Sequence, residues 1–76
     1  MKELLTLFAQ GLVKDAGRVS VRERSEDGGV RFEIEVAPAD RGRVIGRGGR
    51  TVESLRTVMQ AVAARRGEIC SLEVRG

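Results

Sequence analysis

The chain contains no histidine, tryptophan or tyrosine, and its only aromatic residues are two phenylalanines. Histidine is the most common general base in enzymes and a ligand in most zinc-binding patterns. The sequence also shows no evident pair of carboxylates placed for acid and base catalysis. We therefore expect neither an enzyme nor a protein that binds a metal ion or a cofactor.

Cysteine and long apolar runs are equally scarce. The single cysteine, Cys70, forms no internal disulfide, and its alternation with Leu72 and Val74 predicts a small buried side chain in a strand. No apolar run approaches the roughly 20 residues that span a bilayer. The first residues, MKELLTLFAQG, place Glu3 where a secretory signal would be basic, so they predict an ordinary helix. These features predict a cytoplasmic protein.

The chain is rich in charged residues and in aliphatic hydrophobic residues. Its 76 residues are 41% hydrophobic and 33% charged, which is typical of a folded domain. A chain this short buries only about 60% of its unfolded surface and has room for one core. We therefore expect one domain, residues 1–76, with helices packed on one face of a sheet.

The net charge of +3 is unevenly distributed along the sequence. Residues 1–40 carry six basic against eight acidic side chains, and residues 67–76 carry one arginine against two glutamates. Residues 41–66 carry seven arginines against Glu53 alone, a net charge of +6. An anionic partner is expected to bind this middle segment.

The first half of the chain predicts a helix followed by a hairpin. Apolar residues at helical spacing favour a helix over residues 2 to about 14, with Gly17 just past its end. The stretches RVSVRER and VRFEIEV alternate apolar and polar residues on either side of the turn SEDGG. This pattern is typical of an antiparallel hairpin with one wet face. The apolar residues of the first helix, which are expected to be buried against the sheet, are Leu4, Leu5, Phe8, Leu12 and Val13.

The second half predicts two helices and a last strand. Pro38 suits the first turn of a short helix over about 38–45, where Asp40 complements the helix dipole. A longer helix is expected over about 50–65, with Gly67 just past its end, and ICSLEV then forms a strand. The predicted order is α-β-β-α-α-β. The buried face of the long helix is expected to hold Val52, Leu55, Val58, Met59, Val62 and Ala63.

Between the two helices stands RVIGRGGR, three glycines and three arginines in eight residues. A Walker A loop would follow a strand and continue with Lys-Ser or Lys-Thr, and a dinucleotide fingerprint would need glycine in place of Thr51. Neither pattern fits. The remaining pattern is G-x-x-G, in which bare backbone lets a phosphate approach the start of the following helix, while Arg47 adds charge.

The stretch VIGRGGRTV, in its place among six elements, resembles the V-I-G-x-x-G-x-x-I motif of KH domains with the bacterial, type II topology. The stretches MKEL, VAPADRGRVIGRGGR and LRTVMQAVAARRG further resemble the small single-KH RNA-binding proteins of the KhpA type. The resemblance covers nearly the whole chain. It implies an α+β fold, in which a three-stranded mixed sheet carries the helices on one face.

The resemblance also implies a site for single-stranded RNA, with phosphates on the G-x-x-G loop and bases in a neighbouring groove. The side chains on the wet face of the sheet carry mixed charge and no aromatic ring, which argues against base stacking there. The short connection RGE before the last strand suggests few contacts and little sequence choice. Side chains near Ile34 are further candidates for the groove wall. The RNA-binding residues expected are Gly46, Arg47, Gly48, Gly49, Arg43, Arg50, Ile45 and Val52.

Two classes of function remain open at this point. One is an RNA chaperone or post-transcriptional regulator. The other is a protein-interaction module that acts as a homodimer or as the partner of a larger KhpB (Jag)-type KH protein, including a role in ribosome assembly. Whether Arg56, Arg65 and Arg66 touch RNA or form only a solvated face is equally open. Nothing in the sequence implies a membrane partner.

Overall fold

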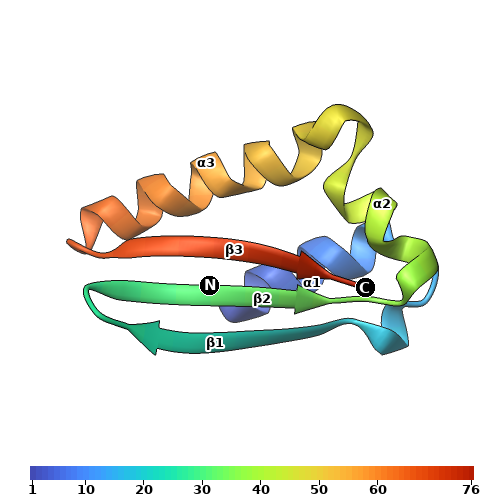
Figure 1. Cartoon of the computed structure of the whole chain (residues 1–76), viewed down its shortest axis with the longest axis horizontal. Coiled ribbons are helices and arrows are strands. Elements are labelled where there is room, and N and C mark those ends of the chain that lie inside the picture. Colours follow the sequence, from blue (N-terminus) through green and yellow to red (C-terminus); the bar gives the residue numbers. More distant parts are fainter.

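The computed structural model describes all residues, 1–76, and confirms the predicted α-β-β-α-α-β order (Figure 1). Short 3₁₀ turns at Ala16–Arg18, Pro38–Asp40 and Arg47–Gly49 connect the main elements. The turn at Pro38–Asp40 takes the first half of the short helix expected over 38–45. The main elements are α1 (Lys2–Leu12), β1 (Ser20–Glu26), β2 (Gly29–Glu35), α2 (Arg41–Ile45), α3 (Arg50–Arg65) and β3 (Ile69–Arg75).

The three strands form one mixed sheet in the order β1-β2-β3. The hairpin partner β1 runs antiparallel to β2, with Val21 opposite Ile34, whereas β3 runs parallel to β2, with Val74 opposite Ile34. The hairpin turn is tighter than the five-residue stretch SEDGG suggests, because Glu26 already pairs with Gly29. The middle strand is therefore β2, and β3 lies at one edge.

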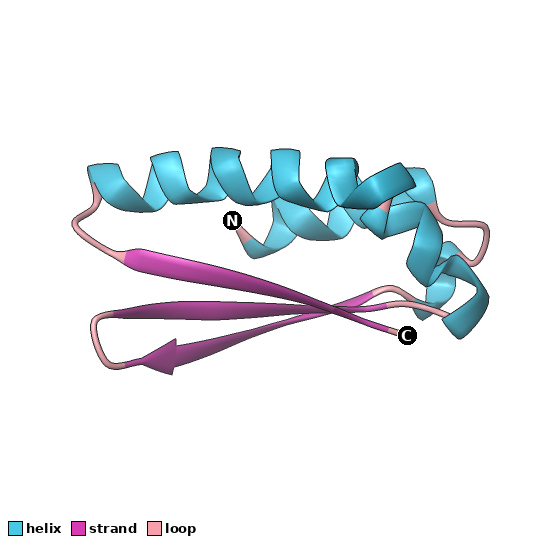
Figure 2. Ribbon diagram, turned by 45° about the horizontal axis from the view of Figure 1, so that its top comes forward, coloured by secondary structure: helices cyan, strands magenta, loops and turns pink.

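All helices lie on one face of the sheet and leave the other face open (Figure 2). Leu5, Val44, Ile34 and Met59, from four different elements, are at most 1% exposed and form the centre of the core. Cys70 is buried, as predicted, and burial raises the pKa of its thiol. No helix is long and apolar enough to cross a bilayer.

The open face of the sheet holds one buried charge. Glu33 is only 4% exposed, although the alternation in VRFEIEV predicts it on the solvent-facing side of the sheet. Arg24 of β1 and Arg75 of β3 each lie 3.1 Å from one of its carboxylate oxygens. The two guanidinium groups cover the carboxylate and compensate its charge, which is how a glutamate is buried without a large penalty.

Asp40 was expected to complement the dipole of the short helix, but its carboxylate instead binds the backbone of residues 14 and 15. Its carboxylate is buried and accepts hydrogen bonds from the backbone amides of Asp15 (3.1 Å) and Lys14 (3.2 Å), and Arg43 lies 3.4 Å away. The two backbone donors, aided by Arg43, hold the pKa of Asp40 below its usual value. Capture of these amides also explains why α1 ends at Leu12 and not near residue 14.

Candidate nucleic-acid interface

The loop between α2 and α3 depends on glycine at three positions. Gly46 (φ 79°, ψ 169°) adopts a backbone region open only to glycine, and Gly48 and Gly49 are left-handed, with φ of 65° and 77°. A Cβ on Gly46 would collide with the side chain of Thr51, whereas the space around Gly48 and Gly49 is open. The first glycine is therefore fixed by packing, and the other two leave the backbone uncovered toward solvent.

Backbone hydrogen bonds close the loop, and no side chain caps the helix that follows it. The amide of Gly49 donates to the carbonyl of Gly46 over 3.0 Å, which fixes the turn. No side chain caps the start of α3. The first amides of an α-helix have no partner within the helix and carry the positive end of its dipole. An anion at the loop would be attracted by the positive end of this dipole, although the first amide of α3, that of Arg50, already donates to the carbonyl of Arg47.

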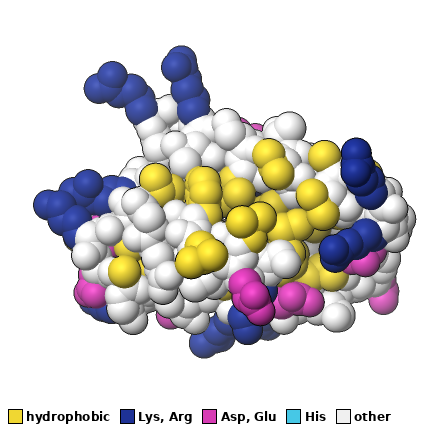
Figure 3. All heavy atoms as spheres, turned by 180° about the vertical axis from the view of Figure 1, so that it is seen from behind, with side chains coloured by type: hydrophobic (Ala, Val, Ile, Leu, Met, Phe, Trp, Pro, Cys, Tyr) yellow, Lys and Arg dark blue, Asp and Glu magenta, His cyan; other side chains and the backbone are white.

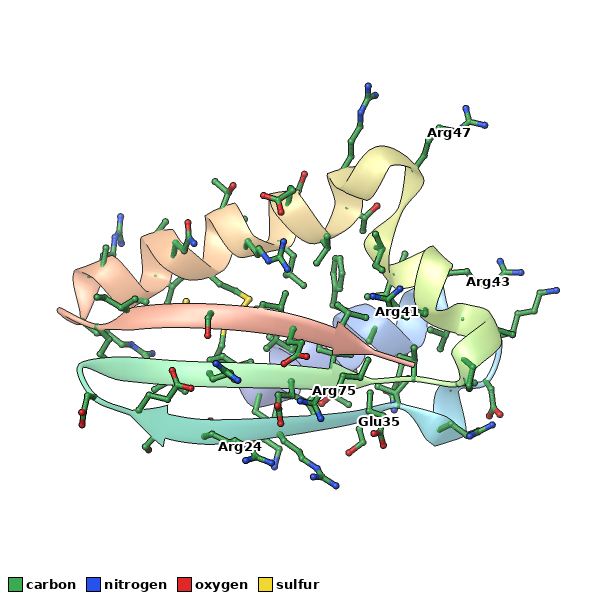
Figure 4. The ribbon with its side chains drawn as sticks, in the orientation of Figure 1. Arg24, Glu35, Arg41, Arg43, Arg47 and Arg75 are labelled. Carbon is green, nitrogen blue, oxygen red and sulfur yellow. The ribbon has the colours of Figure 1, made fainter.

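The arginines around the loop differ in whether a carboxylate already pairs with them. Arg47 and Arg50 are exposed and form no ion pair, and Arg47 projects away from the molecule (Figure 4). Arg43 is also exposed, but it pairs with Asp40. Arg41 lies on the opposite side of α2, toward the end of β3 (Figure 4). Arg47 and Arg50 are thus two unpaired cations that flank the glycine backbone.

A hollow of about 430 Å³ adjoins the loop and runs between α3 and β3. Ile45 and Val52, both predicted groove residues, line it together with the backbone of Gly48 and Gly49. Gly46, Arg43, Arg47 and Arg50 lie outside the hollow, at or beside the loop. The remaining lining residues are Arg41, Glu53, Arg56, Leu72, Glu73 and Val74.

The predicted groove wall near Ile34 is wrong. Ile34 is fully buried on the middle strand, and the wall is formed instead by Leu72, Glu73 and Val74 of β3. The reason is the strand order, which puts β3 at the edge of the sheet beside α3. A right-handed crossover from β2 through two helices to a parallel strand was the signal that would have located this wall.

Sequence reasoning missed one arginine of the groove and left a second one undecided. Arg41 was counted only in the overall charge, and Arg56 was left between RNA contact and solvated face. Both line the hollow beside the loop. Arg65 and Arg66 lie at the far end of α3, by a different hollow. No group of three or more His, Cys, Asp or Glu side chains lies close enough to hold a metal ion.

Comparison with known proteins places the chain among proteins of the same length. The family model described as KhpA/KhpB, KH domain, matches residues 2–74. The chain is 41% identical over 75 residues to the RNA-binding protein KhpA of Thermotoga maritima, covering 99% of this chain and 100% of that protein. It is 36% identical over 74 residues to the RNA-binding protein KhpA of Clostridium acetobutylicum, with 97% and 99% covered.

Proposed function

Because the chain belongs to the KhpA/KhpB family of KH domains, we propose that it binds single-stranded RNA, with phosphates at Gly46–Gly49 and bases in the groove between α3 and β3. The observation that carries the proposal is the glycine loop itself, which has uncovered backbone at Gly48 and Gly49 next to an apolar-walled hollow. The relatives named above are RNA-binding proteins, which agrees with this assignment.

The two parts of the site suit the two parts of a nucleotide. Exposed glycine backbone, the uncapped start of α3 and the free cations Arg47 and Arg50 provide positive potential for phosphate. Ile45, Val52, Leu72 and Val74 provide apolar surface for bases. The groove is open at its side, so an unpaired strand can enter it, whereas the bases of a duplex are stacked and paired.

Salt dependence tests the proposal most directly. A KH loop holds about four nucleotides, and each neutralised phosphate of a single strand contributes about −0.7 to the slope of log K against log salt concentration. We expect a slope between about −2 and −3 for a short single-stranded RNA, measured by fluorescence anisotropy. Binding that is insensitive to salt, or equally tight to a duplex of the same length, would contradict the proposal.

The same site suggests what the protein does with RNA. It holds no histidine and no metal cluster, so it offers no evident means to cleave the bound strand. A clamp that acts mainly on phosphates and releases RNA intact has the property that an RNA chaperone or post-transcriptional regulator needs. We propose this role for the chain.

A second function is favoured by an exposed apolar face on the helical side of the molecule. Leu4, Leu7 and Val58 are 58%, 68% and 56% exposed, although Leu4 and Val58 were predicted to be buried. Leu4 and Val58 line a hollow of about 460 Å³ between α1 and α3, and apolar side chains gather on this side in Figure 3. Exposed apolar patches of this kind mark protein contacts. We propose that this face pairs two copies of the chain, or the chain with a KhpB-type protein.

Substitution of Val58 by aspartate tests the pairing. We expect the native chain to scatter light as a dimer and Val58→Asp to scatter as a monomer, because an unpaired carboxylate cannot be buried at an apolar contact without a large penalty. RNA affinity per chain should change by less than about 3-fold, since Val58 does not line the RNA groove. Ala64→Asp, exposed on another side of α3, is the control. A native chain that stays monomeric would refute the pairing of two copies through this face.

A further inference from the structure

Arg56 spans the groove from helix to strand. It is held on α3 by an ion pair with Glu53, and its Nη2 donates to the backbone carbonyl of Leu72 on β3 over 3.1 Å. Its side chain is 37% exposed, so part of the guanidinium faces the groove while the rest is covered. Two fixed contacts on opposite walls give this arginine a defined place, unlike the free arginines of the loop.

The guanidinium stands where two hollows meet. The 430 Å³ hollow beside the loop and a smaller one of about 140 Å³, toward the end of α3, are both lined by Arg56 and Leu72. Since a hydrogen bond joins these two residues, they divide the groove between α3 and β3 into two compartments. A base that enters from the glycine loop therefore meets the guanidinium of Arg56 at the inner end of the first compartment.

No aromatic side chain is available to the base. Phe32 of β2 is buried in the hydrophobic core, and Phe8 lines the hollow on the other side of α3. Arginine is the usual substitute, because a planar guanidinium stacks on bases and donates hydrogen bonds to them. Arg41 also lines the compartment, but no hydrogen bond or ion pair fixes it. Arg56 is thus the positioned planar group of the groove.

We propose that Arg56 contacts a base in the groove and selects guanine over adenine. This inference rests on the proposed RNA binding. A guanidinium has five N–H donors and no acceptor, so the bonds to Glu53 and Leu72 leave donors unspent. Guanine presents two acceptors, O6 and N7, to such a fork, whereas adenine replaces the O6 acceptor with an amino group that only donates. The selectivity expected from the short RGE connection alone is therefore too low.

The test compares two short uridine oligomers that differ only in guanine or adenine at their central positions. By fluorescence anisotropy, the native chain should bind the guanine oligomer about 10-fold more tightly. Arg56→Lys keeps the charge but loses the planar fork, so it should bind the adenine oligomer within about 2-fold of native and lose the preference. Arg65→Lys makes the same change on α3 outside the groove and should leave the preference intact.

The outcomes separate this inference from the proposed function. If the native chain binds both oligomers equally, or if Arg56→Lys keeps the preference, Arg56 does not select the base, and RNA binding stands. If Arg56→Lys weakens both oligomers to the same degree, Arg56 contacts a phosphate, and the inference is overturned. If neither oligomer binds to the native chain, the proposed function fails and takes this inference with it.

Discussion

The double substitution Arg47→Asp and Gly48→Asp is expected to weaken binding of single-stranded RNA by about 100-fold or more. It removes one exposed cation and puts two carboxylates on the glycine loop, where the proposal places a phosphate. Loss of a charge-assisted contact, together with repulsion by two acidic groups, corresponds to about 2.7 kcal/mol or more. Aspartate also tolerates the left-handed backbone of Gly48 better than most residues, so the fold should persist.

The chain provides a closely matched control at the other end of α3. Arg66→Asp with Gly67→Asp replaces the same residue types, makes the same change of charge and also targets a left-handed glycine, with φ of 69°. We expect this control to weaken RNA binding only a few-fold, through loss of long-range attraction. Once circular dichroism has shown that both variants fold, fluorescence anisotropy measures how much each one loses in RNA affinity. Equal losses would mean that net charge, and not the loop, holds the RNA.

The fold was largely predictable because its signals are local. Alternation in VRFEIEV, helical spacing after Arg50 and glycine at position 67 each determine an element without reference to the rest of the chain. The glycine loop was equally visible, since its type and place carry the resemblance. Errors of a residue or two at helix ends arose where a distant side chain decided the matter, as Asp40 does for the end of α1.

The groove was less predictable because it is built from elements far apart in the sequence. Its strand wall depends on β3 lying beside α3, and its arginine, Arg56, is fixed by the carbonyl of Leu72, 16 residues away. Periodicity could not show that Leu4 and Val58 fall at the rim of the core and stay exposed. Nor could it show that Arg24 and Arg75 converge on Glu33 across three strands.

Gly46 and Gly48 of the loop should differ sharply when each is replaced by alanine. Gly46→Ala is expected to lower the free energy of unfolding by about 3 kcal/mol or more. Alanine is strained in the backbone region of Gly46, and its Cβ would also collide with Thr51. A domain of this size is stable by only about 4–11 kcal/mol, so the loss is large. Urea unfolding monitored by circular dichroism measures it.

Thr51→Ala provides the matching rescue. It removes the Oγ1 atom that a Cβ on Gly46 would meet, so it should restore part of the stability of Gly46→Ala. Recovery should be incomplete, because the strained backbone and the contact with the Cβ of residue 51 remain. If Gly46→Ala proves as stable as the native chain, the conformation described for the loop is wrong.

Gly48→Ala should behave in the opposite way. Open space surrounds Gly48, so alanine there pays only the left-handed backbone cost of about 1 kcal/mol. Its Cβ nevertheless covers backbone that a phosphate is proposed to approach, so RNA affinity should fall while the fold persists. The contrast separates two roles of glycine in the G-x-x-G motif: Gly46 allows the chain to turn between α2 and α3, and Gly48 leaves the turn accessible to the proposed phosphate.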